Sequence, residues 1–185
     1  MFIQTEQTPN PATLKFLPGT PVLERGTLDF TDAEDARRSP MAEGLFAVDG
    51  VAGVFLGPDF ISVTKDEGRD WAILKPIILG AIMEHYNSGA PMVKAGEDPD
   101  GEVEADGDDD EIVVQIKELL DTRVRPAVAQ DGGDIIFRSF EDGVVYLQMQ
   151  GACSGCPSST ATLKMGIENL LKHFLPEVKE VRAAD

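Results

Sequence analysis

The chain has 185 residues, of which 42% are hydrophobic, and its formal net charge is −17. This apolar content excludes a wholly disordered chain. The acidic excess, without any basic stripe, excludes binding to nucleic acid through clustered lysine and arginine. The length suits one medium domain or two small ones.

Residues 1–90 have the pattern of a mixed α/β module. Turn signals such as Thr8-Pro9-Asn10-Pro11 separate segments of apolar alternation, and the pair Ser39-Pro40 is typical of a helix start. Strands are expected at residues 2–5, 13–16, 51–56 and 60–65, and helices at residues 40–46 and 71–86. The aromatic residues expected in the core are Phe46, Phe55, Phe60 and Trp71. Because this module has no cysteine, we interpret it as a binding or positioning module.

Residues 91–110 have the composition of an acidic linker. Ten acidic side chains and one basic side chain lie between residues 91 and 111, which accounts for about half of the negative excess of the chain. Such a segment repels itself and has little apolar surface to bury. We expect an extended, solvated spacer, and the alternative interpretation is a docking strip for a basic partner.

Residues 111–185 predict a second, smaller module. The run Asp131-Gly132-Gly133-Asp134 is a turn signal, Asp142-Gly143 indicates a hairpin, and Pro126 is expected to end or bend the helix before them. Helices are expected at residues 112–124 and 160–174, and strands at residues 135–140, 144–149 and 177–182. The expected fold class is α+β: two small α/β modules, the second a three-stranded sheet covered by two helices.

The sequence contains no recognisable targeting or membrane segment. Its first residues lack the basic start and apolar core of a secretory signal and the arginine-rich bias of an organellar presequence. The most apolar window, residues 71–86, contains Lys75, Pro76 and Glu84 and is too short to span a bilayer. We therefore expect a soluble, cytoplasmic protein that does not interact with membranes.

The chemistry of the chain is concentrated in Cys153 and Cys156, its only cysteines. They lie between a predicted strand and a predicted helix, where free backbone N–H groups and the helix dipole stabilise thiolates. In a reducing cytosol, such a pair is typical of metal or cluster ligands or of a redox dithiol, rather than of a structural disulfide. The third interpretation is two small residues without a chemical role.

Two thiolates do not complete a typical metal site, because structural zinc and a 4Fe-4S cluster usually have four ligands. The remaining ligands must come from a second chain, from histidine or from exogenous thiols. A symmetric dimer provides them directly, since two copies of one pair face each other across a two-fold axis. A small module of about 75 residues also gains stability from association or from a bound metal.

Specific residues of the second module resemble the C-terminal domain of NifU and of the Nfu-type iron-sulfur proteins. They are Asp131-Gly132-Gly133-Asp134, Gly151, Cys153, Gly155-Cys156-Pro157-Ser158-Ser159, Thr162-Leu163-Lys164 and Gly166-Ile167-Glu168. The first module is similar to the Nfu N-terminal domain in Gln7-Thr8-Pro9-Asn10-Pro11, in Lys15-Phe16 and in its later strand-strand-helix pattern.

This resemblance implies an iron-sulfur cluster carrier or scaffold, and not an enzyme. It implies a homodimer in which Cys153 and Cys156 bind a labile 4Fe-4S cluster, with a 2Fe-2S cluster as the alternative, for transfer to apo-proteins. An upstream scaffold would load the dimer. The further cysteine-bearing domains of nitrogenase-associated NifU are absent from this sequence, which favours a late-acting carrier. Two rival functions stay open, a thiol-disulfide oxidoreductase and a zinc-bridged structural dimer.

Overall fold

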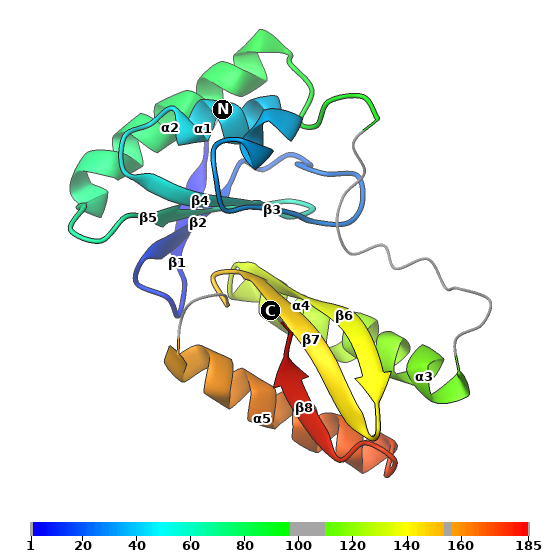
Figure 1. The fold of residues 1–185 in the computed structure, drawn as a ribbon. Helices are drawn as coiled ribbons and strands as arrows, with labels where there is room; N and C mark the ends of the chain where they lie inside the picture. The colour runs from blue at the N-terminus through cyan, green and yellow to red at the C-terminus, as the bar shows by residue number, and fades with distance from the viewer. Residues whose placement is uncertain (1, 97–109, 154–156, 185) are drawn as a thin grey trace. The chain divides into compact units, whose positions relative to one another are not determined.

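The chain forms two compact units, residues Met1–Asp100 and Gly101–Asp185, in a computed structural model that describes residues 2–96, 110–153 and 157–184 (Figure 1). Each unit mixes helices with strands, which confirms the predicted fold class. Most of the predicted acidic linker lies outside the described residues. The predicted domain boundaries at residues 90 and 110 therefore stay a prediction.

The first unit is a five-stranded antiparallel sheet with strand order β1-β2-β5-β4-β3. Its strands are β1 (Gln4–Gln7), β2 (Thr13–Leu17), β3 (Leu28–Phe30), β4 (Val51–Leu56) and β5 (Ile61–Lys65). Its helices are the 3₁₀ helix η1 (Asp35–Arg38), α1 (Pro40–Phe46) and α2 (Trp71–Ser88). The two α-helices lie on the same side of the sheet (Figure 1).

Alternation along the strands explains this one-sided core. Phe16 of β2, Val54 and Leu56 of β4 and Ile61 of β5 are almost completely buried, in one cluster that also contains Ile78 of α2. Side chains two residues apart on a strand point to the same face, so these residues present an apolar surface to the helices.

The predicted aromatic core residues occupy two different environments. Phe55 and Phe60 are both buried, with ring centroids 5.8 Å apart, and the Lys15 ammonium lies 4.8 Å from the Phe60 ring. Phe46 and Trp71 are only partly buried and pack against the helix-side core.

Local capping explains where both helices of this unit begin. Ser39 accepts a hydrogen bond from the backbone N–H of Ala42, and Pro40 is the first residue of α1, as the sequence predicts. Asp70 accepts from the N–H of Ala72 at the start of α2, and Gly89 ends that helix in a left-handed conformation with φ 71°.

Two elements of this unit were not predicted from the sequence. Strand β3 has only three residues, and η1 is a single 3₁₀ turn, so neither contains enough residues for a periodic pattern. Strand β3 exists because Leu28 and Phe30 are buried where the chain pairs with β4, which is a tertiary contact.

The second unit is a three-stranded sheet with strand order β6-β7-β8. Strands β6 (Gly133–Glu141) and β7 (Val144–Gly151) form an antiparallel hairpin, and β8 (Glu180–Ala183) pairs with β7 in parallel after the crossover helix α5 (Pro157–Phe174). Asp142 and Gly143 turn the hairpin with φ of 50° and 81°. These positive values explain why an Asp-Gly pair is needed there.

The helical run before this sheet is continuous but changes its hydrogen-bonding pattern. It consists of α3 (Glu111–Leu119), a π-helical turn η2 (Leu120–Val124) and α4 (Arg125–Gln130). The wider turn precedes Pro126, which has no N–H to donate, so the sequence prediction that this proline bends or ends the helix agrees with the change of pattern. Residues of this run, of α5 and of all three strands share one apolar core.

Among the described residues, no helix combines the length and apolar character that crossing a membrane requires.

The stability of the first unit should depend on pH through His85 near the end of α2. Burial lowers the pKa of this imidazole below its ordinary value, and a hydrogen bond with the backbone of Ala90 opposes the shift. The unfolded chain therefore binds the proton more readily, so the free energy of unfolding should fall as pH decreases from 7.5 to 5.5. Thermal unfolding measured across this pH range should show a smaller loss of stability for His85→Gln than for the unchanged protein. Equal pH dependence in both proteins would contradict this assignment.

Candidate functional site

Cys153 lies directly after β7, two residues beyond the end of that strand. Its side chain is only 6% exposed and belongs to the apolar core of the second unit, together with Ile135 and Ile167. Helix α5 begins at Pro157, three residues before the helix that the sequence predicts at residues 160–174. Cys156, the second predicted ligand, lies outside the described residues, so the structure shows the surroundings of one thiol of the pair.

The backbone beside Cys153 is packed too closely to accept another side chain. A β-carbon on Gly133 would lie 2.8 Å from the Cys153 sulfur and 2.7 Å from the carbonyl oxygen of Gln150. Gly133 is the register partner of Gly151 at the end of the hairpin, where Gly132 and Gly151 have φ of 81° and 65°. The N–H of Ala152 donates to the carbonyl of Gly132 over 3.2 Å. Because Gly133 has no side chain, Ala152 and Cys153 can pack closely against the start of β6.

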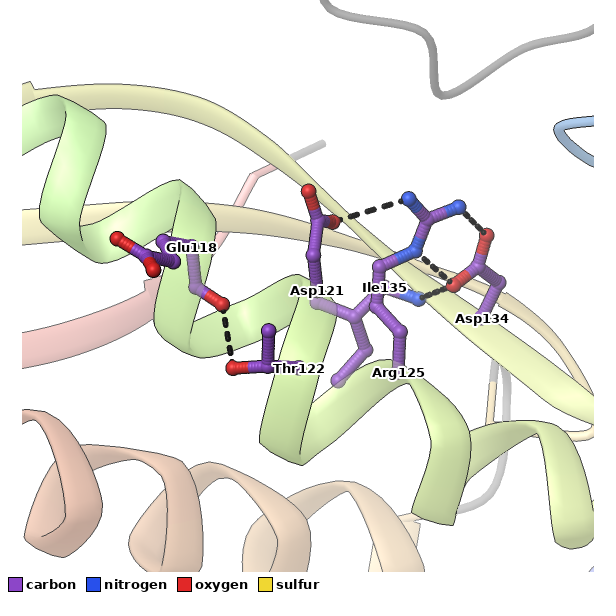
Figure 2. Close-up of polar contacts among 6 residues, drawn as sticks. All are labelled: Glu118, Asp121, Thr122, Arg125, Asp134 and Ile135. Carbon is purple, nitrogen blue, oxygen red and sulfur yellow. Dashed lines mark hydrogen bonds and ion pairs between the residues drawn. The ribbon is translucent and has the colours of Figure 1, made fainter.

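An ion pair connects the start of β6, next to Gly132 and Gly133, to the helical run of residues 111–130. Asp134 is 3% exposed, and its carboxylate accepts two hydrogen bonds from Arg125, at 2.9 Å from Nε and 2.8 Å from a terminal nitrogen (Figure 2). The N–H of Ile135 donates to the same carboxylate over 2.8 Å. The pair is bidentate and satisfies both oxygens, as a buried carboxylate requires.

Arg125 also contacts a second carboxylate, which is more exposed. Its other terminal nitrogen donates to Asp121 over 3.1 Å, one turn earlier in the helix (Figure 2). The hydrogen bonds to Asp134 raise the pKa of the Arg125 guanidinium above its ordinary value, and burial partly opposes them. The guanidinium therefore stays charged at every accessible pH.

The π-helical turn lies directly before the helix that contains Arg125. The hydroxyl of Thr122 donates to the carbonyl of Glu118 over 2.7 Å, which satisfies an acceptor next to the wider turn (Figure 2). Arg125 is the first residue after this turn, at the start of α4. The π-helical turn therefore ends at Val124, next to the arginine of the ion pair.

Sequence reasoning missed Arg125 and interpreted Asp134 only as part of a turn. Nothing in the spacing of these two residues indicates a pair, because they lie nine residues apart on a helix and a strand. The available signal was weaker: Asp134 directly precedes the apolar run Ile135-Ile136-Phe137, where a carboxylate needs a partner if it is buried.

The described residues contain no group of three or more His, Cys, Asp or Glu side chains that could hold a metal ion. The candidate ligand that they contain is the Cys153 sulfur beside Gly133, in the segment before α5.

Comparison with known proteins identifies the family of both units. A family model described as "Scaffold protein Nfu/NifU N terminal" matches residues 3–89, and one described as "NifU-like domain" matches residues 116–182. The human protein named "NFU1 iron-sulfur cluster scaffold homolog, mitochondrial" is 56% identical over 182 residues, which cover 98% of this chain and 71% of the human protein. The chain belongs to the Nfu-type iron-sulfur scaffold family.

Two fly relatives agree with this assignment. The proteins of the same name from Drosophila sechellia and Drosophila simulans are each 53% identical over 98% of this chain. The chain spans 64% of the length of each fly protein. A solution structure of a NifU-like protein from Saccharomyces cerevisiae aligns with 51% of this chain and 86% of its own, at 24% identity and a TM-score of 0.46.

The prediction of a cytoplasmic protein is wrong. The human and Drosophila scaffold proteins that resemble this chain are named as mitochondrial. The prediction rested on the lack of a recognisable targeting segment, and such a lack does not determine a compartment, because a compartment is set by a receptor-read address rather than by the fold.

Gly133→Ala should destabilise the second unit by about 1–3 kcal/mol, because the new methyl group overlaps the Cys153 sulfur and the Gln150 carbonyl. Chemical denaturation of the apo-protein measures this change. Gly166→Ala is the matched control, since a β-carbon there meets no atom within 4 Å, and alanine in helix α5 should be neutral or stabilising by up to about 1 kcal/mol. Equal effects of the two substitutions would contradict the packing described for Gly133.

Arg125→Met should lower the free energy of unfolding by about 2–4 kcal/mol, because it leaves the Asp134 carboxylate buried without its cation. The control is Asp121→Asn, which removes only the exposed contact to the same guanidinium and should change stability by less than about 1 kcal/mol. Urea titrations of both variants measure the difference. A loss for Asp121→Asn as large as that for Arg125→Met would show that the Asp134 pair is not the main contact.

Proposed function

We propose that this chain is a carrier that binds an iron-sulfur cluster through Cys153 and Cys156 and transfers it to apo-proteins. The observation that carries the proposal is the cysteine count in a chain of the Nfu scaffold family: two cysteines, separated by two residues. A 4Fe-4S cluster usually has four cysteine ligands. A homodimer supplies them with one pair from each chain, so the cluster is bound between two copies.

The burial of Cys153 adds a condition to this proposal. The residue is only 6% exposed and its sulfur lies close to Gly133 within the apolar core, which leaves little of it accessible to a second copy of the chain. Cluster loading would therefore require the Cys153 thiol to become more exposed than it is in this structure.

Transfer then needs only ligand exchange at the iron atoms. A client cysteine loses its thiol proton and binds iron as the thiolate, while the displaced cysteine of the carrier takes up a proton. Each iron keeps its number of thiolate ligands, and no atom is oxidised or reduced. Tighter ligation in the client provides the driving force, so the protein acts without turnover chemistry of its own.

The domain organisation completes the proposal. Residues 1–90 would position a client, residues 91–110 would act as an acidic tether, and residues 111–185 would hold the cluster. An upstream scaffold would load the dimer before it meets the client. The relatives named above are mitochondrial, and we adopt that compartment for this chain.

Anaerobic reconstitution with iron and sulfide should give a coloured dimer with about four iron atoms per two chains. Iron and sulfide analysis, combined with the measured mass of the coloured species, tests this expectation. A monomer that binds a complete cluster would contradict shared ligation. A colourless zinc-bound dimer, or catalytic reduction of insulin by the apo-monomer, would favour the structural or the oxidoreductase function instead.

Cys153→Ser and Cys156→Ser should each abolish stable cluster binding while far-ultraviolet circular dichroism of the apo-protein stays unchanged, because each variant removes two of the four thiolates of the dimer. Ser154→Ala is the matched control, since it changes a residue between the cysteines and keeps both thiols. Full cluster occupancy in either cysteine variant would refute the assignment of these ligands.

A further inference from the structure

Helix α2 of the first unit is apolar on its outer side as well as on its core side. Leu74, Ile78 and Ile82 are buried against the sheet, whereas Ile73 is 67% exposed and Ile77 is 49% exposed. A helix that only covers a sheet usually presents charged or polar residues to water. Exposed isoleucines one turn apart therefore indicate a surface that another molecule covers.

These isoleucines line a groove of about 820 Å³ between α2 and the segment that follows α1. The α2 residues that line it include Ile73, Ile77, Gly80 and Glu84, which follow the helical repeat along a single face. The face spans twelve residues, from Ile73 to Glu84, or about 16 Å at the rise of an α-helix. A β-carbon at Gly44 or Gly80 would meet no atom within 4 Å, so the absence of side chains there deepens the groove.

The charged residues of the groove are mostly acidic. Asp49, Asp70 and Glu84 contribute carboxylates, and Arg69 is the one cation among the residues that line the groove. The Arg69 guanidinium is already paired with Asp49 over 2.8 Å, and Asp70 caps α2. The groove therefore has an apolar floor and a net negative edge.

The charge pattern argues against three kinds of occupant: the chain's own acidic segment, nucleic acid and anionic lipid. The segment of residues 91–111 carries ten acidic side chains, so the edge of the groove repels the chain's own tether. Nucleic acid and anionic lipid are repelled for the same reason. A partner that complements both features has aliphatic side chains flanked by lysine or arginine.

We propose that this groove docks a basic amphipathic helix of a partner protein. The lining residues follow the axis of α2 over about three turns, which matches a helix lying alongside it. A helix satisfies its own backbone hydrogen bonds, so it can lie on this apolar floor without unpaired polar groups. The groove belongs to the unit without cysteines, so this docking does not depend on cluster ligation.

The test measures binding of a synthetic peptide to the full-length apo-protein by fluorescence anisotropy. The probe is a stapled amphipathic helix with leucines on one face and lysines at both edges of that face. Ile77→Glu should weaken its binding about tenfold or more, because it places a charge on the apolar floor. Met83→Glu is the matched control: Met83 is also exposed on α2, at 38%, but does not line the groove, so its variant should bind as the unchanged protein does.

A charge test distinguishes specific docking in this groove from non-specific hydrophobic binding. Glu84→Lys should weaken binding of the lysine peptide. A higher salt concentration should reduce the difference in affinity between this variant and the unchanged protein. A peptide with glutamates in place of the lysines should bind at least tenfold more weakly to the unchanged protein. If Ile77→Glu reduces the helical circular dichroism, Ile73→Glu replaces it, since Ile73 is more exposed.

Several outcomes would overturn the proposal. They are the absence of binding of the lysine peptide, equal binding of the glutamate peptide, and unchanged affinity in the Ile77→Glu and Ile73→Glu variants. Self-association of the apo-protein that Ile77→Glu abolishes would also overturn it, because the occupant would then be a second copy of this chain. Cluster reconstitution of the Ile77→Glu variant provides an independent readout, since its cluster content should equal that of the unchanged protein.

Discussion

The second unit depends on the buried contact between Arg125 and Asp134. This ion pair connects the first turn of α4 to the first residues of β6, and Gly133, next to Asp134, is the residue against which the Cys153 sulfur packs. A bidentate pair holds both position and orientation, because two parallel hydrogen bonds restrict rotation as well as distance. The geometry of the cysteine turn therefore depends on a residue more than twenty positions earlier in the chain.

The burial of Cys153 bears on the proposed carrier role. Under that proposal, a thiol that is buried in the apo-protein must become accessible when a cluster binds. In this structure, Cys153 is only 6% exposed, two residues after Gly151, which has a left-handed φ of 65°. The two features lie in different units: both cysteines belong to the second, whereas the apolar, acid-edged groove belongs to the first, which has no cysteine.

Much of the fold could be predicted because local patterns agree with the tertiary structure. Ser39 and Pro40 start α1 where expected, and Asp142 and Gly143 turn the β6-β7 hairpin, whereas α5 begins three residues before the expected helix. Strand β3 and the 3₁₀ turn η1 could not be predicted, because a few residues contain no period. The π-helical turn before Pro126 was predicted only as a bend, since sequence shows that the N–H is missing but not how neighbouring residues compensate.

The sequence by itself determined the family, the two-cysteine motif and the order of most elements, because these depend on residue identity and on spacing along the chain. Only the tertiary structure decided that Asp134 is buried against Arg125, that Cys153 lies in the core beside Gly133, and that Ile73 and Ile77 line an open groove. Apolar residues occur on every side of α2, so their spacing cannot show which of them the sheet covers. Burial is a property of what packs against a residue, and those neighbours come from distant parts of the chain.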